Sequence, residues 1–187
     1  MKSIQELKKL LFVPLTNFDL ERYIGKNKIV KFSDIDEMQN IDQLLPNPKD
    51  FRIILFQTTS DSSGHWICIC RDDAKKEYVF FDSYGNKLGT HTQRFNTSHQ
   101  NKLLGIEDHA LKNLLKTRKK GMKIISNPYR LQSLSSGSET CGRFCVLFLK
   151  MYLDKGYTLE QFKDFIDDAK VKLKLESRDL VSCYYIN

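Results

Sequence analysis

Residues 132–149 read QSLSSGSETCGRFCVLFL, and this stretch decides how the chain can fold. It opens as a polar loop that contains Gly137 and closes as a segment, 144–149, that is apolar nearly all round. A helix that is apolar on every side is buried in the core of its protein. We therefore expect a buried helix over residues 140–153, with Cys141 in its first turn.

The position of Cys141 suits a nucleophile. Backbone N–H groups at a helix N-terminus carry partial positive charge and favour the thiolate form of a cysteine. Gly142 would let a substrate backbone approach closely, and the amide of Gln132 could donate to an oxyanion. Taken alone, Cys141 is also explained as a small residue at a helix start. The four other cysteines are read as structural: Cys68, Cys70, Cys145 and Cys183.

A base and an acid precede this stretch in the chain. His65 lies in Gly64-His65-Trp66, where a loop enters an apolar strand, so it can be held rigidly yet face a cleft. Asp82 ends the next apolar strand, which one hairpin links to the strand that begins beside His65. The hairpin can bring the carboxylate of Asp82 to the imidazole. Taken singly, His65 could be an ordinary surface or core histidine and Asp82 an ordinary turn residue.

A metal site made of His65, Cys68 and Cys70 is the rival assembly. The spacing lacks the paired CxxC units of structural zinc sites. Strand alternation also places Cys68 and Cys70 on one face, as two core thiols would be. We expect no metal.

The rest of the sequence predicts a single α+β domain spanning residues 1–187. Apolar runs at 51–56, 66–70 and 78–81 indicate an antiparallel meander, with further strands at 29–30 and 122–125. Helices are expected over 3–11, 33–45, 104–118, 140–153 and 158–175, and the remainder of 15–32 is expected to be irregular. This pattern gives a central mixed or antiparallel sheet flanked by helices.

The composition limits the setting and the partners. The start of the chain lacks the features of a signal peptide and no apolar run could span a bilayer, so we expect a non-secreted protein whose five cysteines are thiols. The net charge of +7 favours acidic partners such as nucleic acid. The densest basic stretch holds Lys116, Arg118, Lys119 and Lys120 as candidate polyanion contacts. The alternative is a solvated helix face and loop.

The order of these motifs resembles a known family. His65-Trp66, then Phe81-Asp82-Ser83-Tyr84-Gly85, then Gln132 and the run from Cys141 through Cys145 are similar to adenain, the adenovirus endopeptidase, and its relatives. Those relatives include proteases of ubiquitin-like proteins and maturation proteases of virophages and large DNA viruses. The matching region covers residues 51–153. Papain-like enzymes place the cysteine first and do not fit.

The resemblance implies a triad of His65, Asp82 and Cys141, with Gln132 as an oxyanion donor and the nucleophile at the start of a buried helix. Trp66 would pack near the histidine and Gly142 would support the site. Adenain has Glu where this chain has Asp82, and the loop from Gln132 to Cys141 is slightly longer here.

The function so implied is a monomeric cysteine endopeptidase that cleaves viral capsid or core precursors after small residues, at Gly-Gly-type sites, in the virion and the infected cell. The chemistry requires no cofactor, and DNA or a peptide would be the activator by resemblance. Two alternatives stay open: a deconjugating protease of ubiquitin-like modifiers, and a non-catalytic nucleic-acid-binding module.

Overall fold

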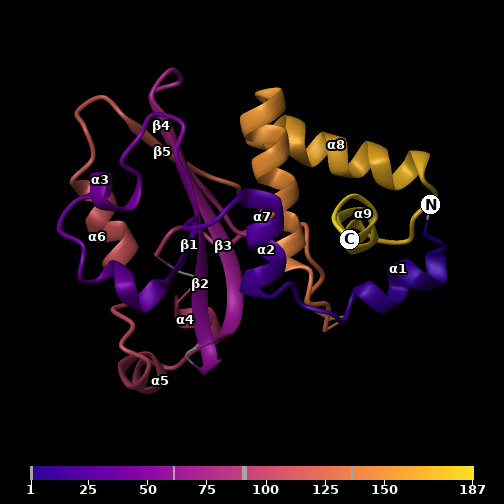
Figure 1. The fold of residues 1–187 in the computed structure, drawn as a ribbon, viewed down its shortest axis with the longest axis horizontal. Helices are drawn as coiled ribbons and strands as arrows, with labels where there is room; N and C mark the ends of the chain where they lie inside the picture. Colours follow the sequence, from indigo (N-terminus) through magenta and orange to yellow (C-terminus); the bar gives the residue numbers. More distant parts are fainter. Residues whose placement is uncertain (1, 61, 90–91, 136) are drawn as a thin grey trace.

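The computed structural model of the chain describes residues 2–60, 62–89, 92–135 and 137–187. A five-stranded sheet in the order β1-β2-β3-β4-β5 lies at its centre (Figure 1). The strands are β1 (Ile29–Lys31), β2 (Phe51–Ser60), β3 (Ser63–Asp72), β4 (Glu77–Phe81) and β5 (Lys123–Ser126). Strands β2, β3 and β4 pair antiparallel, whereas β1 and β5 run parallel to their neighbours. The predicted α+β class, mixed sheet and central meander are confirmed.

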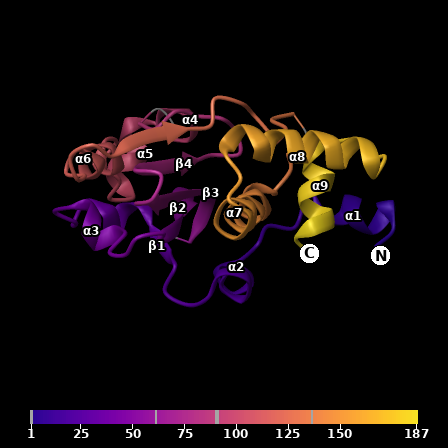
Figure 2. The same ribbon diagram turned by 90° about the horizontal axis from the view of Figure 1, so that it is seen from above.

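Helices cover both faces of the sheet (Figure 2). One face carries α1 (Ile4–Leu10), α2 (Asn17–Ile24), α7 (Cys141–Leu149), α8 (Leu159–Lys172) and α9 (Arg178–Tyr185). The other carries η1 (Phe32–Ile35), α3 (Ile41–Leu44) and α6 (Ala110–Lys116). The short helices α4 (Thr92–Phe95) and α5 (Ser98–Leu103) lie at one end of the sheet, and a π-helical turn, η2 (Lys150–Asp154), continues α7. In the described residues, every helix is too short or too polar to cross a bilayer.

Strand alternation divides the core into two clusters. On β3, Trp66, Cys68 and Cys70 face α7, whereas Ile67 and Ile69 face the opposite layer. All nine residues of α7 are buried, as its apolar sequence predicted. The ring of Phe148 in α7 stacks on Phe81 of β4 with 4.5 Å between centroids. This packing fixes the start of α7 relative to the ends of β3 and β4.

Several element predictions were wrong. The residues after Leu15 form α2, which begins with a reciprocal pair of bonds between Thr16 and Asp19. The helix predicted over 33–45 is two separate turns, η1 and α3. The helix predicted over 104–118 is shorter and begins only at Ala110, after Gly105 with a φ of +67°. Helices α4, α5 and α9 were not predicted.

Candidate active site

Cys141 is the first residue of α7, and its side chain borders a cleft. The residue is 4% exposed, and the eight residues after it in α7 are buried. The cleft has a volume of about 330 Å³ and is lined by His65, Tyr84, Phe95, Gln132 and Glu139, among others, together with Cys141. The loop before α7 therefore delivers the sulfur to a cleft that also contains the histidine.

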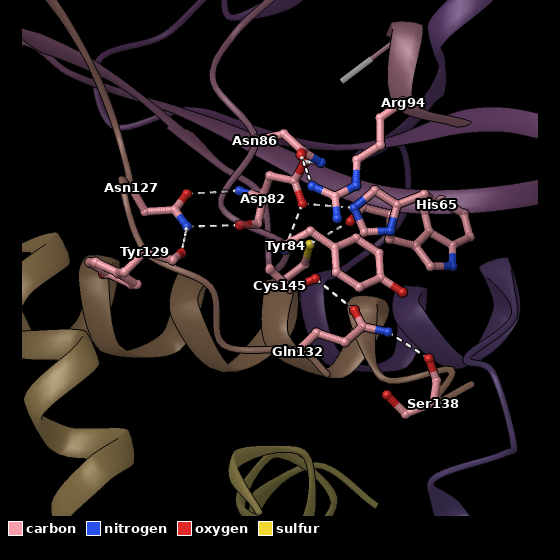
Figure 3. Close-up of polar contacts among 12 residues, drawn as sticks. His65, Asp82, Tyr84, Asn86, Arg94, Asn127, Tyr129, Gln132, Ser138 and Cys145 are labelled. Carbon is pink, nitrogen blue, oxygen red and sulfur yellow. Dashed lines mark hydrogen bonds and ion pairs between the residues drawn. The ribbon is translucent and has the colours of Figure 1, made fainter. Parts of the chain in front are cut away.

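His65 and Asp82 meet because β3 and β4 pair antiparallel. Cys68 lies opposite Phe81 at the end of β4, so the residue that follows β4 reaches the beginning of β3. His65 Nε2 lies 2.8 Å from Asp82 Oδ1 (Figure 3). Both side chains are almost completely buried, with exposures of 5% and 0%. The hairpin inferred from the sequence spacing thus brings the two residues together.

Cys141 and His65 line the same cleft, and the Cys141 thiol lies close enough to the imidazole to help raise its pKa. Because Asp82 occupies Nε2, Nδ1 is the ring nitrogen left to meet the sulfur. The carboxylate of Asp82 is thus bonded to the imidazole, and the thiol of Cys141 lies beside the imidazole in the same cleft.

The electrostatics favour a charged histidine. Burial alone would lower the pKa of His65, but the charge and hydrogen bond of Asp82, with a smaller contribution from Cys141, raise it from 6.5 to about 10. Burial would raise the pKa of Asp82, and this is outweighed by His65 and by hydrogen bonds from the Tyr84 N–H and the Asn86 amide, so the pKa is lowered.

A network of amides holds Asp82 in place. The Asn86 side chain donates to Asp82 Oδ2 at 2.8 Å and accepts from Arg94 at 2.7 Å. Asn127 accepts the Asp82 N–H at 2.9 Å and donates to the Asp82 carbonyl at 2.7 Å. Figure 3 shows these contacts reaching Asp82 from different sides. The carboxylate and its backbone are therefore fixed independently of His65.

Two neighbouring aromatic rings pack against the imidazole. The centroid of the His65 ring lies 4.8 Å from that of Tyr84 and 4.9 Å from that of Phe95, each at 30°. Burial, followed by the charges of Cys141 and Glu139, raises the pKa of Tyr84 to about 12, so its phenol stays neutral. These rings limit rotation of the imidazole.

Gln132 lines the cleft and is held at both ends of its amide. Its Oε1 accepts from Ser83 Oγ at 2.7 Å, and its Nε2 donates to the Ser138 carbonyl at 2.6 Å. Ser83 directly follows Asp82, and its carbonyl also accepts the N–H groups of Leu131 and Gln132. One turn thus positions both the acid and the amide.

Trp66 and Gly142 pack against each other. The Trp66 indole donates to the Leu15 carbonyl at 3.2 Å. A Cβ at Gly142 would lie 3.1 Å from Trp66 Cδ1 and 3.3 Å from Leu15 Cβ. The sequence linked Gly142 to the approach of a substrate; its missing side chain also serves the packing of α7 on Trp66. The His65 ring is packed by Tyr84 and Phe95 instead.

The other cysteines are buried thiols. Burial raises the pKa of Cys68 and of Cys70, and the Cys145 thiol points to the Trp66 carbonyl at 3.5 Å. By strand alternation His65 faces away from Cys68 and Cys70, so these three residues do not converge. Among the described residues, no group of His, Cys, Asp and Glu is placed to hold a metal.

The candidate polyanion contacts lie far from this cleft. They precede β5, whose first residue pairs with the start of β4, whereas Asp82 follows the end of β4. Lys116, Lys119 and Lys120 are exposed. Arg118 donates to the carbonyls of Met122 and Leu115 and so closes its own turn.

Sequence reasoning missed several supporting residues: Ser83, Asn86, Asn127 and Asp179. Ser83 lies inside the recognised Asp82 motif, so its place beside the acid was a usable signal. Asn127 precedes Pro128, and nothing in the local sequence indicates its bonds to Asp82. Asp179, which accepts hydrogen bonds from the hydroxyls of Ser138 and Thr140, belongs to α9, which was not predicted.

The arrangement can support nucleophilic chemistry. It combines a thiol, an imidazole that can hold its proton, a carboxylate that orients the imidazole, and N–H groups at the start of a helix.

Comparison with known proteins gives a relative over almost the whole chain. The chain is 30% identical over 181 residues to the uncharacterized protein V9 of Sputnik virophage, covering 96% of this chain and 98% of that protein. No protein-family model matches.

Among solved structures, the chain is similar to the SUMO protease Ulp1, with a TM-score of 0.42 and 15% identity over 97% of this chain and 82% of that one. It is also similar to ChlaDub1 from Chlamydia trachomatis, with a TM-score of 0.43 and 14% identity over 92% and 76% of the chains.

Proposed function

Because this chain belongs to the same protein family as the uncharacterized protein V9 of Sputnik virophage, and because three reactive side chains share one cleft, we propose that it is a cysteine endopeptidase that matures viral precursor proteins. Cys141 is the nucleophile, His65 the base and Asp82 the residue that orients the base. The observation that carries the proposal is a buried imidazole that is bonded to a carboxylate and shares one cleft with the Cys141 thiol. A virophage relative supports the viral setting.

In the proposed reaction, His65 Nδ1 holds the proton of the Cys141 thiol. The thiolate attacks the scissile carbonyl carbon, and N–H groups at the start of α7 bind the resulting oxyanion. His65 then gives its proton to the leaving amine, and the peptide C–N bond breaks. Water attacks the acyl-enzyme and gives its proton to His65, so the carboxylic acid leaves and the thiol is restored.

Gln132 would have one of its two amide N–H donors available for the oxyanion. A carboxamide has two N–H donors, and the Ser138 carbonyl takes one of them. The second can serve the oxyanion while Ser83 holds the amide oxygen. Gln132 is therefore proposed as a fixed donor.

The substrate would extend beyond the cleft into a neighbouring hollow of about 550 Å³. The two share Ser63, Gly64 and Glu139, and the hollow is lined by apolar side chains that include Phe12 and Phe18. The preference for small residues, such as those of a Gly-Gly site, is proposed from the resemblance to adenain. An apolar substrate residue would occupy the hollow.

Activation by DNA or by a peptide is a further part of the proposal. The net charge of +7 and the exposed Lys116, Lys119 and Lys120 support a polyanion contact. Because these lysines lie at the other end of β4 from Asp82, DNA bound there would act at a distance from Cys141.

The test is cleavage of a capsid-type precursor that contains a Gly-Gly site by the wild-type chain and two variants. Cys141→Ala should abolish cleavage, and Cys145→Ala, one turn further along α7, is the matched control and should retain it. Full activity in Cys141→Ala would refute the assignment. A ubiquitin-like modifier that bears a C-terminal fluorogenic amide tests the alternative. Rapid release of the fluorophore, without precursor cleavage, would favour a deconjugating protease instead.

A further inference from the structure

Helix α7 begins differently from the other helices that are directly preceded by a Ser or Thr. In α1, α2, α5, α8 and α9 the residue before the helix has an extended backbone, and its hydroxyl accepts an N–H of the first turn: Ser3, Thr16, Thr97, Thr158 and Ser177. Thr140 precedes α7 with a φ of −99° and a ψ of 1°, and its side chain makes no capping bond. Since a cap satisfies first-turn N–H groups, those of α7 keep their capacity to bind another acceptor.

The Thr140 hydroxyl is occupied elsewhere. It donates to Asp179 Oδ1 of α9 at 2.5 Å. The same carboxylate accepts from Ser138 Oγ at 2.9 Å and from the Ser133 N–H at 3.1 Å. Asp179 therefore binds the loop before Cys141 near its beginning and at its end.

Burial strengthens this arrangement. Asp179 is 3% exposed, and hydrogen bonds to a carboxylate are stronger when water is excluded. Ser138, held through its hydroxyl, also receives the Gln132 amide on its carbonyl. Both groups proposed to bind the oxyanion, the start of α7 and Gln132, are thus positioned through contacts of this one carboxylate.

We propose that Asp179 is a positioning residue that keeps the N-terminus of α7 uncapped. By binding the Thr140 hydroxyl, it holds Thr140 out of the extended conformation from which a hydroxyl accepts first-turn N–H groups, so those of α7 stay available beside Cys141. Asp179 acts through Thr140 and the loop and not on the reacting atoms. This inference rests on the proposed function, because the free N–H groups matter only if Cys141 is the nucleophile.

The test compares four variants by kcat, KM and the rate at which iodoacetamide alkylates Cys141. Asp179→Ala frees the Thr140 hydroxyl to cap α7, so kcat and the alkylation rate should fall about tenfold or more while KM changes little. Adding Thr140→Val removes the freed hydroxyl and should restore most of the loss. Asp179→Asn, whose amide oxygen still accepts, should lose less, and Asp168→Asn on the exposed face of α8 is the charge-matched control.

The outcomes separate the two hypotheses. Alkylation of wild-type Cys141 no faster than in the urea-unfolded chain contradicts the proposed function itself. Fast wild-type alkylation, combined with a double variant at least as impaired as Asp179→Ala, overturns the role of Asp179 alone. If circular dichroism shows that Asp179→Ala does not fold, Asp179→Asn with and without Thr140→Val decides by the same criterion.

Discussion

At the scale of single residues, the decisive feature is a histidine buried between a carboxylate and a thiol. The Asp82 carboxylate accepts hydrogen bonds from the His65 ring, the Tyr84 N–H and the Asn86 amide, each at 2.8 Å. A carboxylate with several donors stays ionised, and an ionised Asp82 keeps the imidazole protonated. The resting form is therefore best described as an imidazolium beside Cys141, ready for attack once a substrate arrives.

The raised pKa of His65 predicts how stability depends on pH. The folded pKa of about 10 lies above the unfolded value near 6.5, so the contribution of His65 is complete below about pH 6.5 and is lost as the pH rises through about 10. The difference in unfolding free energy between the wild type and His65→Gln should shrink over that window. Urea titrations from pH 5 to pH 10 measure it, with the exposed His99→Gln as control. A difference independent of pH would contradict the ion pair.

Ser83 offers a second test at this scale. Its hydroxyl holds Gln132 Oε1 at 2.7 Å, and both residues are buried. Ser83→Ala should lower kcat several-fold by freeing the amide. If Ser83 acts through Gln132, adding Ser83→Ala to Gln132→Ala should cost little more than Gln132→Ala alone. A double-mutant cycle on kcat/KM measures this coupling, and full additivity would show that Ser83 does not act through Gln132.

At the scale of elements, the sequence predicted those features that follow from local pattern. The meander, the capped start of α8 and the buried α7 all come from apolar periodicity and from Ser or Thr at helix starts. The pairing of His65 with Asp82 also followed, because one hairpin links them.

The elements that were missed depend on tertiary packing. Most residues of helix α9 (RDLVSCYY) are of types with weak helix propensity, and the helix is stabilised by contacts with α1, α7 and α8. In α2 only Leu20 is buried, so the apolar pattern was faint. For the same reason Asp179 and Asn127 could not be assigned: their partners are distant in sequence, and only the folded chain brings them together.

The buried helix α7 predicts a large effect from one side chain. Phe148 is fully buried and stacks on Phe81. Phe148→Ala should destabilise the protein by about 3–5 kcal/mol, because the cavity adds to the lost apolar transfer energy. Chemical denaturation measures the change, with the 70% exposed Phe18→Ala as the matched control. Equal changes in both variants would mean that α7 is not packed as described.

At the scale of the whole molecule, segments far apart in the sequence converge on α7. Arg143 donates to the Val13 carbonyl at 2.5 Å and to the Ile186 carbonyl at 3.2 Å. The Glu139 N–H donates to the Leu11 carbonyl at 2.6 Å. Both terminal regions therefore help to hold the helix that carries the nucleophile, while the basic residues before β5 lie at the other end of the sheet.

That separation predicts where a polyanion binds. The triple variant Lys116→Glu, Lys119→Glu, Lys120→Glu should weaken binding to duplex DNA at least tenfold and flatten its salt dependence. The control carries the same charge change on the last turn of α8 and just beyond: Lys170→Glu, Lys172→Glu, Lys174→Glu. Fluorescence anisotropy over a range of salt concentrations gives both quantities. Equal loss in the two triples would indicate attraction by net charge alone.

Covalent labelling of Cys141 measures whether His65 activates the sulfur. A peptide vinyl sulfone that ends in Gly-Gly, mapped by mass spectrometry, should modify Cys141 rapidly in the folded wild type and much more slowly in His65→Ala, while the buried Cys68, Cys70, Cys145 and Cys183 stay unlabelled. Labelling of Cys141 that does not depend on His65, or none above that of the unfolded chain, would show that the imidazole does not activate the sulfur.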